Sequence, residues 1–171
     1  GHSIDMSRVE LPMMFNLHHP LNLEVIGPEA QRDNMQSAAY RVIWGFLRKC
    51  PASKVRFCIF DPKEGGGSVR MLSNFVNKMP DSYKKAVTQM SRTEELLSCL
   101  KELEGQTLDF IRDRPDYDDL LDYNAHNPRR TEAITLLMLY DFPLNADARC
   151  LELLSSVMQK GNKCGIYVIL C

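Results

Sequence analysis

Three residues that could take part in chemistry each follow directly after an apolar run typical of a buried strand. The carboxyl ends of parallel strands meet at one edge of a sheet, where ligands bind in α/β proteins, so we expect the three residues to share that edge. A glycine there lets backbone N–H groups approach a phosphate, and an aspartate can hold Mg²⁺. The three are Gly27 after residues 21–26, Asp61 after residues 55–60, and Asp141 after residues 134–140.

The segment from Gly27 to Asn34 stands where a strand, a phosphate-binding loop and a helix would follow one another. Such a loop reads Gly-x-x-x-x-Gly-Lys-Ser/Thr, in which the lysine offsets phosphate charge and the hydroxyl binds Mg²⁺. The first glycine is present, but Arg32, Asp33 and Asn34 replace the second glycine, the lysine and the hydroxyl. Asp33 would add negative charge where phosphate must be neutralised. We therefore interpret the segment as a capped turn, with Asp33 or Asn34 at the helix start.

The second half of a nucleotide-hydrolysing site is an apolar strand that ends in Asp, usually followed by Glu. The Asp holds Mg²⁺ and the Glu polarises the attacking water. Here Asp141 ends the strand and Phe142 follows it, and a phenyl ring cannot act as a base. Lys63, just beyond the strand that ends at Asp61, is the candidate to replace the missing lysine charge. The sequence predicts a site that does not hydrolyse ATP and has no catalytic residue.

Apolar runs alternate with helical patterns along the chain, which predicts an α/β fold with a mostly parallel sheet flanked by helices. Four strands are expected, in the order strand, helix, strand, helices, strand, helix, strand. The acidic patch of Asp116, Asp118, Asp119 and Asp122 is interpreted as the solvated face of a short helix before the third strand. The buried stripe of the long helix is predicted to consist of Leu96, Leu97, Leu100, Leu103, Leu108 and Ile111, and that of the last helix to include Leu151. Strands are expected at 21–26, 55–60, 134–140 and 165–171, and helices from about 33 to 50, 69 to 76, 92 to 112 and 146 to 159.

The composition is that of a folded domain, with 44% hydrophobic and 25% charged residues and a net charge of −1. No basic excess indicates nucleic-acid binding, and the longest apolar stretch is too short to span a bilayer. The six cysteines form no Cys-x-x-Cys pair, so we expect reduced thiols and a cytoplasmic protein that makes no membrane contact. Residues 1–20 are interpreted as a cloning scar with an extension, and residues 21–171 as one domain. The apolar run at its end suggests a fragment cut from a longer protein.

Several short motifs, in this order, resemble those of FtsK/SpoIIIE-type ATPases, a family of DNA translocases and related secretion motors. Gly27-Pro-Glu-x-x-Arg-Asp33 and Asp141-Phe-Pro143 resemble a degenerate subgroup of that family. Together the matches cover about residues 21–171, although each motif alone is weak. The others are Asp61-Pro62-Lys63, Tyr123-Asn124, residues 137–141, and residues 164–170.

The resemblance implies a P-loop NTPase (RecA-like) architecture that is truncated at its last strand. It also implies a structural or regulatory pseudo-ATPase, with no cofactor expected, that docks to active ATPase modules of the same or identical chains. DNA would be reached only through the full-length protein, which could itself be an ATPase. One alternative is a motor domain of a DNA translocase or secretion motor that still binds or hydrolyses ATP with Mg²⁺, with Arg32 on a phosphate. Another is a Mg²⁺-binding hydrolase that uses Asp61 and Asp141 as a metal-binding carboxylate pair.

Overall fold

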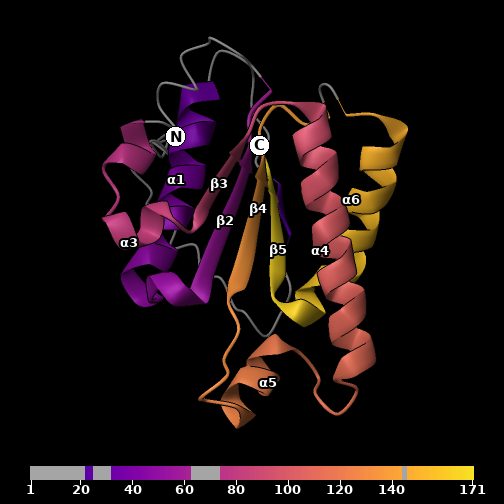
Figure 1. Cartoon of the computed structure of the whole chain (residues 1–171). Helices are drawn as coiled ribbons and strands as arrows, with labels where there is room; N and C mark the ends of the chain where they lie inside the picture. Colours follow the sequence, from indigo (N-terminus) through magenta and orange to yellow (C-terminus); the bar gives the residue numbers. More distant parts are fainter. Residues whose placement is uncertain (1–21, 25–31, 63–73, 144–145) are drawn as a thin grey trace, which may run out of the picture.

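A five-stranded parallel sheet forms the centre of the molecule, with helices on both of its faces (Figure 1). The structure, a computed structural model, describes residues 22–24, 32–62, 74–143 and 146–171. The strand order is β1-β5-β4-β2-β3, and every neighbouring pair is parallel. The prediction of an α/β fold with a parallel sheet flanked by helices is confirmed.

The elements alternate between strand and helix along most of the chain. They are β1 (Leu23–Glu24), α1 (Arg32–Lys49), the 3-10 helix η3 (Ala52–Lys54), β2 (Val55–Phe60), α3 (Asp81–Lys84), β3 (Val87–Met90), α4 (Thr93–Asp113), α5 (Leu120–His126), β4 (Ile134–Leu139), α6 (Ala148–Lys160), the 3-10 helix η4 (Gly161–Cys164) and β5 (Ile166–Leu170).

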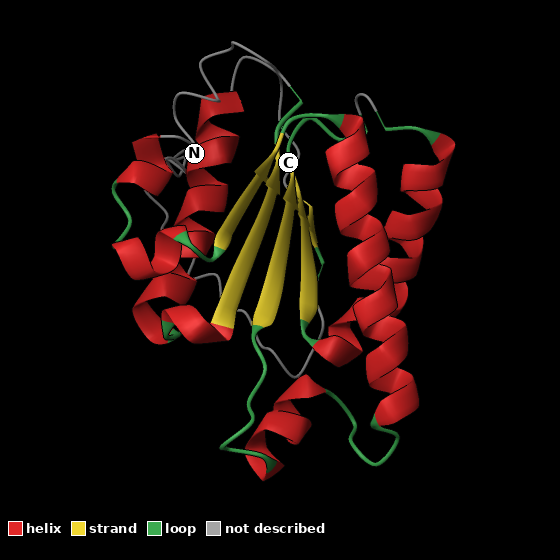
Figure 2. Ribbon diagram, in the orientation of Figure 1, coloured by secondary structure: helices red, strands yellow, loops and turns green. Residues whose placement is uncertain are grey.

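The central strand β4 is buried along its whole length, which explains why all of its side chains except that of Thr135 are apolar. It pairs with β2 from Val55↔Ile134 to Phe60↔Leu139, and with β5 on its other side. Figure 2 shows the strand arrows pointing toward one edge, and we call this the carboxyl edge and the opposite one the amino edge. The short helix α5 lies beyond the amino edge (Figure 1).

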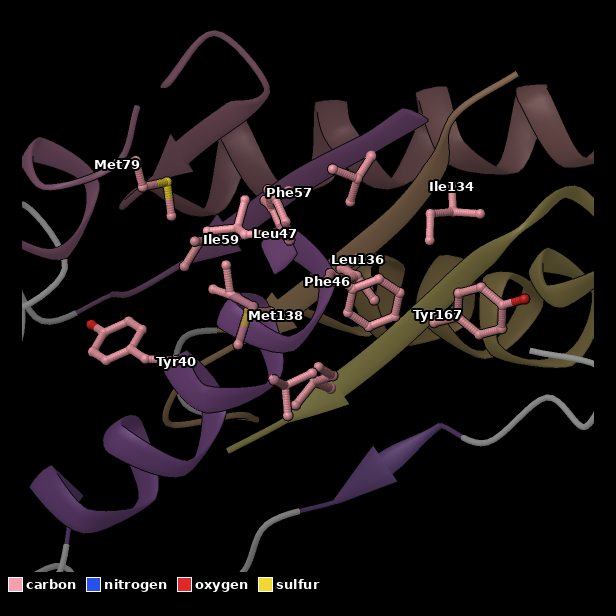
Figure 3. Packing of buried hydrophobic residues seen from close by; sticks show 14 of the residues in the cluster. Tyr40, Phe46, Leu47, Phe57, Ile59, Met79, Ile134, Leu136, Met138 and Tyr167 are labelled. Atoms are coloured by element: carbon pink, nitrogen blue, oxygen red, sulfur yellow. The ribbon is translucent and has the colours of Figure 1, made fainter. Parts of the chain in front are cut away.

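Two hydrophobic clusters cover the two faces of the sheet. On the α1 and α3 face, Phe57 and Ile59 of β2 pack with α1, α5 and the inward residues of β4 and β5 (Figure 3). On the α4 and α6 face, Cys58 and Phe60 pack with residues of both helices. The strict alternation along β2 follows from the period of two in a strand. Both faces are covered, so the edges of the sheet are where a ligand could reach backbone and strand-end groups.

The edge strand β3 and the short helix α3 before it were not predicted. Residues 87–90 read Val-Thr-Gln-Met, in which Thr88 and Gln89 are exposed. A four-residue strand with two polar residues has no apolar run to reveal it, and its pairing with β2 is set by the tertiary fold. The sheet therefore has five strands where the sequence predicts four. Of the helix predicted at 69–76, the described part is helical at residues 74–77.

The predicted stripes of the two long helices were partly wrong. Leu108 and Ile111 of α4 are 49% and 40% exposed, and Leu151 of α6 is 44% exposed. Thr107 faces inward instead, because its hydroxyl donates to the carbonyl oxygen of Leu103 at 2.8 Å. Cys99, Thr107 and Phe110 complete the buried line of α4, and Cys150, Leu154 and Val157 form that of α6.

Side chains cap three of the helices. Asp119 and Asp147 accept hydrogen bonds from backbone N–H groups in the first turns of α5 and α6. Glu95 reaches back to the backbone N–H groups of Ser91 and Arg92, at 3.0 and 3.2 Å. Asp119 of the predicted acidic patch is thus a helix cap. Among the described residues, no helix combines the length and the apolar character that a membrane crossing requires.

Candidate functional site

The carboxyl ends of β2 and β4 lie side by side, and each is followed by an aspartate. The backbone N–H of Asp61 donates to Met90 of β3, and that of Tyr140 donates to Phe60 of β2, both at 2.9 Å. Phe75 and Tyr83, which come after β2 in the sequence, pack on the α1 face, whereas α6, which comes after β4, packs on the other face. In α/β sheets, ligands bind beyond the carboxyl ends of strands at such a change of direction. This is the candidate site.

The two aspartates of this edge differ in environment. Asp61 is 3% exposed, which is rare for a carboxylate. Asp141 is half-buried and has a φ of 52°. That left-handed conformation is costly for most residues and is tolerated best by Gly, Asn and Asp. Local strain of this kind clusters at functional sites, so the turn after β4 is a candidate for a position kept for its side chain.

Asp61 and Asp141 place negative charge at the ends of β2 and β4. Burial raises the pKa of Tyr140, and Tyr40, Cys171 and the Asp61 carboxylate raise it further. Burial raises the pKa of the Cys171 thiol to about 12, with a contribution from the charge of Asp141. Both aspartates therefore act electrostatically on groups around the strand ends. An acidic edge attracts cations and opposes the binding of phosphate groups.

Phe142 is a packing residue in the structure. Its half-buried ring lies against the hydrophobic cluster on the α4 and α6 face. That no Glu follows Asp141 to act as a base is read from the sequence alone. The structure adds that the ring of Phe142 packs against the cluster between the sheet and the helices α4 and α6. A carboxylate at that position would have to leave this apolar environment to reach a substrate.

The predicted phosphate-loop residues are only partly described. Helix α1 begins at Arg32, so Arg32, Asp33 and Asn34 form its first turn, and their side chains lie outside the described part. Gly27 and Lys63 also lie outside the described residues. The proposed roles of Arg32 as a phosphate contact and of Lys63 as a replacement charge stay predictions.

For the alternative of a Mg²⁺ site at Asp61 and Asp141, the structure supports the placement of the two aspartates but offers no larger group of metal ligands among the described residues. The parallel pairing of β2 with β4 places Asp61 and Asp141 after neighbouring strand ends. Within residues 22–24, 32–62, 74–143 and 146–171, no group of three or more His, Cys, Asp or Glu side chains could hold a metal ion. Carboxylate sites for Mg²⁺ often have only one or two protein ligands and complete their coordination with water and substrate.

The sequence did not predict that aromatic residues gather near the carboxyl edge. The ring of Tyr40 on α1 stacks on Phe75 at 4.6 Å between centroids and lies 6.4 Å from the ring of Tyr140. Cys171 joins the edge because its N–H donates to Leu139 of β4 at 2.9 Å. These contacts depend on β5 lying beside β4 and on the packing of α1, which no local pattern predicts.

The Tyr123-Asn124 motif lies at the opposite, amino edge. The Asn124 side chain donates to the carbonyl oxygen of Glu132 at 3.0 Å and accepts from its N–H at 2.8 Å. The guanidinium of Arg114 lies 4.2 Å from the centre of the Tyr123 ring and pairs with the carboxylate of Glu132. The motif thus holds the segment before β4 in place by hydrogen bonds and a cation–π contact. This role is structural.

The fold is similar to those of several solved ATPases. The conjugation coupling protein TcpA of pCW3, solved as a monomer with ATPγS, matches with a TM-score of 0.67 at 12% identity over 91% of this chain and 43% of its own. EssC (ATPases 2 and 3) of Geobacillus thermodenitrificans matches with a TM-score of 0.64 at 14% identity over 87% of this chain and 27% of its own. EccC (ATPases 2 and 3) of Thermomonospora curvata, solved with a signal sequence peptide, gives 0.60 at 15% identity over 90% and 25%.

The matches are in structure alone. No protein-family model matches the sequence, and no curated protein matches it either. The chain spans less than half the length of each of the three solved proteins, which are larger, and two of them contain more than one ATPase module. These neighbours are FtsK/SpoIIIE-type ATPase domains. The chain therefore has the fold of an FtsK/SpoIIIE-type ATPase domain.

Proposed function

We propose that this domain is a pseudo-ATPase module, which keeps the scaffold of an FtsK/SpoIIIE-type motor but does not hydrolyse ATP. One observation carries the proposal: Phe142, directly after Asp141 at the end of β4, packs its ring into the hydrophobic cluster. In a hydrolysing site a base next to the metal-binding Asp activates water. A phenyl ring cannot do so, and the packing of Phe142 gives it a different role.

The charge of the edge supports the same proposal. ATP brings negative charge that a lysine and Mg²⁺ normally offset. Asp33 in the first turn of α1 stands where that lysine is expected, and Asp61 and Asp141 add further negative charge at the strand ends. Each of these carboxylates opposes the approach of a triphosphate unless a cation intervenes.

We further propose that the module acts by docking to active ATPase modules of the same or identical chains in the cytoplasm. The similar solved proteins support this, because two of them carry ATPases 2 and 3 in one chain and this chain spans 27% and 25% of their lengths. A module without turnover can still position a neighbour or regulate it. Contact with DNA or with a transported polypeptide would then belong to the full-length protein.

Release of phosphate from ATP and Mg²⁺ tests the loss of hydrolysis. We expect the purified chain to release phosphate no faster than a sample without protein, and the Asp141→Asn variant to behave identically. Turnover by the native chain that disappears in Asp141→Asn would refute the proposal. Asn tolerates the positive φ of this position as Asp does, so the variant should keep its fold and serve as a matched control.

A second candidate is a Mg²⁺-dependent hydrolase, favoured by the placement of Asp61 and Asp141 after adjacent strands. Two carboxylates can hold Mg²⁺ with water in the remaining positions. A titration with Mg²⁺, followed by the melting temperature, separates this candidate from the first. A rise in Tm that is lost in Asp141→Asn would favour the hydrolase, and an unchanged Tm would favour the pseudo-ATPase.

A further inference from the structure

Two buried thiols from different elements share one pocket, which neither Asp61 nor Asp141 lines. Cys58 on β2 and Cys99 on α4 belong to the same hydrophobic cluster and are 1% and 8% exposed. Both also line an open pocket of about 490 Å³ between α4 and the strands β2 and β3. The pocket gives a small solute access to thiols that are otherwise covered by the core.

Charged residues surround the mouth of this pocket. Arg56 precedes Cys58 by two positions on β2 and therefore points to the same face of the sheet. Its guanidinium donates to Glu102 of α4 at 2.9 Å, and that side chain also lines the pocket. Glu95 lines the pocket too, while its carboxylate is held by the start of α4. The ion pair joins α4 to β2 and keeps a cation beside Cys58.

The two thiols perturb each other. A hydrogen bond from Cys99 lowers the pKa of Cys58, against the effect of burial, and the charge of Arg56 lowers it further. The same hydrogen bond and burial raise the pKa of Cys99. Arg56 lies two positions before Cys58 on the same face of β2 and lines the same pocket, so the negative charge is favoured on the sulfur of Cys58 while Cys99 stays protonated. A thiolate of low pKa beside a second thiol is the arrangement found where peroxides oxidise cysteine.

We propose that Cys58 and Cys99 are a thiol pair that hydrogen peroxide oxidises to a disulfide linking β2 to α4. The Cys58 thiolate attacks one peroxide oxygen, the O–O bond breaks, and the leaving hydroxide takes a proton to become water. Cys58 is then a sulfenic acid. The sulfur of Cys99 attacks the sulfur of Cys58, the S–O bond breaks, and the second hydroxide leaves with the proton of Cys99 as water. Two thiols lose two electrons and the peroxide gains them.

The order of the two steps follows from the electrostatics. While Cys58 is a thiolate, its hydrogen bond with Cys99 keeps the second thiol protonated. Oxidation of Cys58 removes that negative charge, and with it the main cause of the raised pKa of Cys99. The second thiol then loses its proton more readily and can attack. The disulfide can therefore form from the sulfenic acid of Cys58 and the thiol of Cys99, without a third cysteine.

Peptide mapping after treatment with hydrogen peroxide tests the proposal on the purified, reduced chain. The expected product is a Cys58–Cys99 cross-linked peptide pair, abolished by dithiothreitol. In Cys99→Ala the sulfenic acid should persist on Cys58 and be trapped by dimedone, and in Cys58→Ala Cys99 should gain no dimedone. As a control, Cys150→Ala should give the same cross-link as the native chain, because burial raises the pKa of that thiol.

Two results would overturn the proposal. In the native chain, Cys58 and Cys99 could both be recovered as alkylatable thiols after peroxide has oxidised Cys50 or Cys171. Alternatively, Cys58 could be found linked to a cysteine other than Cys99. Both results come from the native chain, so they stand even if a variant fails to fold.

Discussion

The two edges of the sheet differ in how their polar groups are used. At the amino edge, polar side chains satisfy one another and the backbone: Asn124 holds Glu132 by two hydrogen bonds, and the side chain of Lys54 donates to the carbonyl oxygen of Thr131 at 3.1 Å. At the carboxyl edge, Asp61 and Asp141 place negative charge beside buried groups. The comparison teaches that the polar groups of the amino edge stabilise the fold, while those of the carboxyl edge gather negative charge at the strand ends, where we propose the altered nucleotide site.

The largest effect is expected at the amino edge, for Gly165→Ala. Gly165 has a φ of 74°, and an added Cβ would lie 2.4 Å from Cδ2 of the buried Leu120. Strain and the clash together should lower the free energy of unfolding by about 2–4 kcal/mol, measured by urea denaturation. The control is Gly105→Ala in α4, where a Cβ meets nothing within 4 Å. It should stabilise by about 0.5–1 kcal/mol. Equal effects of the two changes would contradict this account of the amino edge.

The next largest effect is expected for Asn124→Ala. The change removes both hydrogen bonds to the backbone of Glu132, so the free energy of unfolding should fall by about 1–2 kcal/mol. Arg130→Ala nearby, at an exposed position, should change it by less than about 0.5 kcal/mol. If both variants unfold at the same urea concentration as the native chain, the motif has no structural role and a functional one must be sought.

At the carboxyl edge, substitutions should affect stability through the backbone more than through charge. Asp141→Val puts a β-branched residue at a φ of 52° and should cost about 1–2 kcal/mol. Asp141→Asn should cost less than about 0.5 kcal/mol, because Asn adopts this conformation readily. A large loss of stability in Asp141→Asn would show that the negative charge, and not the backbone conformation, decides the stability of this turn, and would contradict this account of the carboxyl edge.

The smallest effect concerns Glu95, an acid at the carboxyl edge that has structural partners. Hydrogen bonds from the backbone N–H of Ser91 and from the Arg92 side chain lower the pKa of Glu95 to about 2, from a usual value of 4.5. The ionised form is therefore favoured in the folded state. Its contribution is complete above pH 4.5 and is lost as the pH falls toward 2. The Glu95→Gln variant should be less stable than the native chain near neutral pH, and the difference should shrink over this range. A difference independent of pH would contradict the assignment.

The fold was largely predictable because the strands β2, β4 and β5 are apolar along their length. Their residues are buried on both faces, so the local pattern and the tertiary environment agree. The strand β3 was not predictable, since Thr88 and Gln89 are exposed and its pairing depends on the tertiary fold. The inward face of α4 was mispredicted for a related reason, because Thr107 is buried through a hydrogen bond and Leu108 is not buried.

The candidate site was predictable only in part. The positions of Asp61 and Asp141 after strands follow from the sequence, because each ends an apolar run. Their placement on neighbouring strands, together with Tyr40 and Cys171 at the same edge, follows from a strand order that local sequence does not encode. The same holds for Cys58 and Cys99, which are far apart in the chain and meet only because α4 packs on β2.

Calorimetric titration of ATP with Mg²⁺ into the purified chain tests the central claim most directly, namely that the scaffold is kept while the nucleotide site is lost. The account predicts no heat of binding up to millimolar ATP, in the native chain and in Asp141→Asn alike. Binding with a micromolar Kd that is lost in Arg32→Ala or in Lys63→Ala would contradict it. That result would mean that one of these cations has taken over the role of the missing lysine.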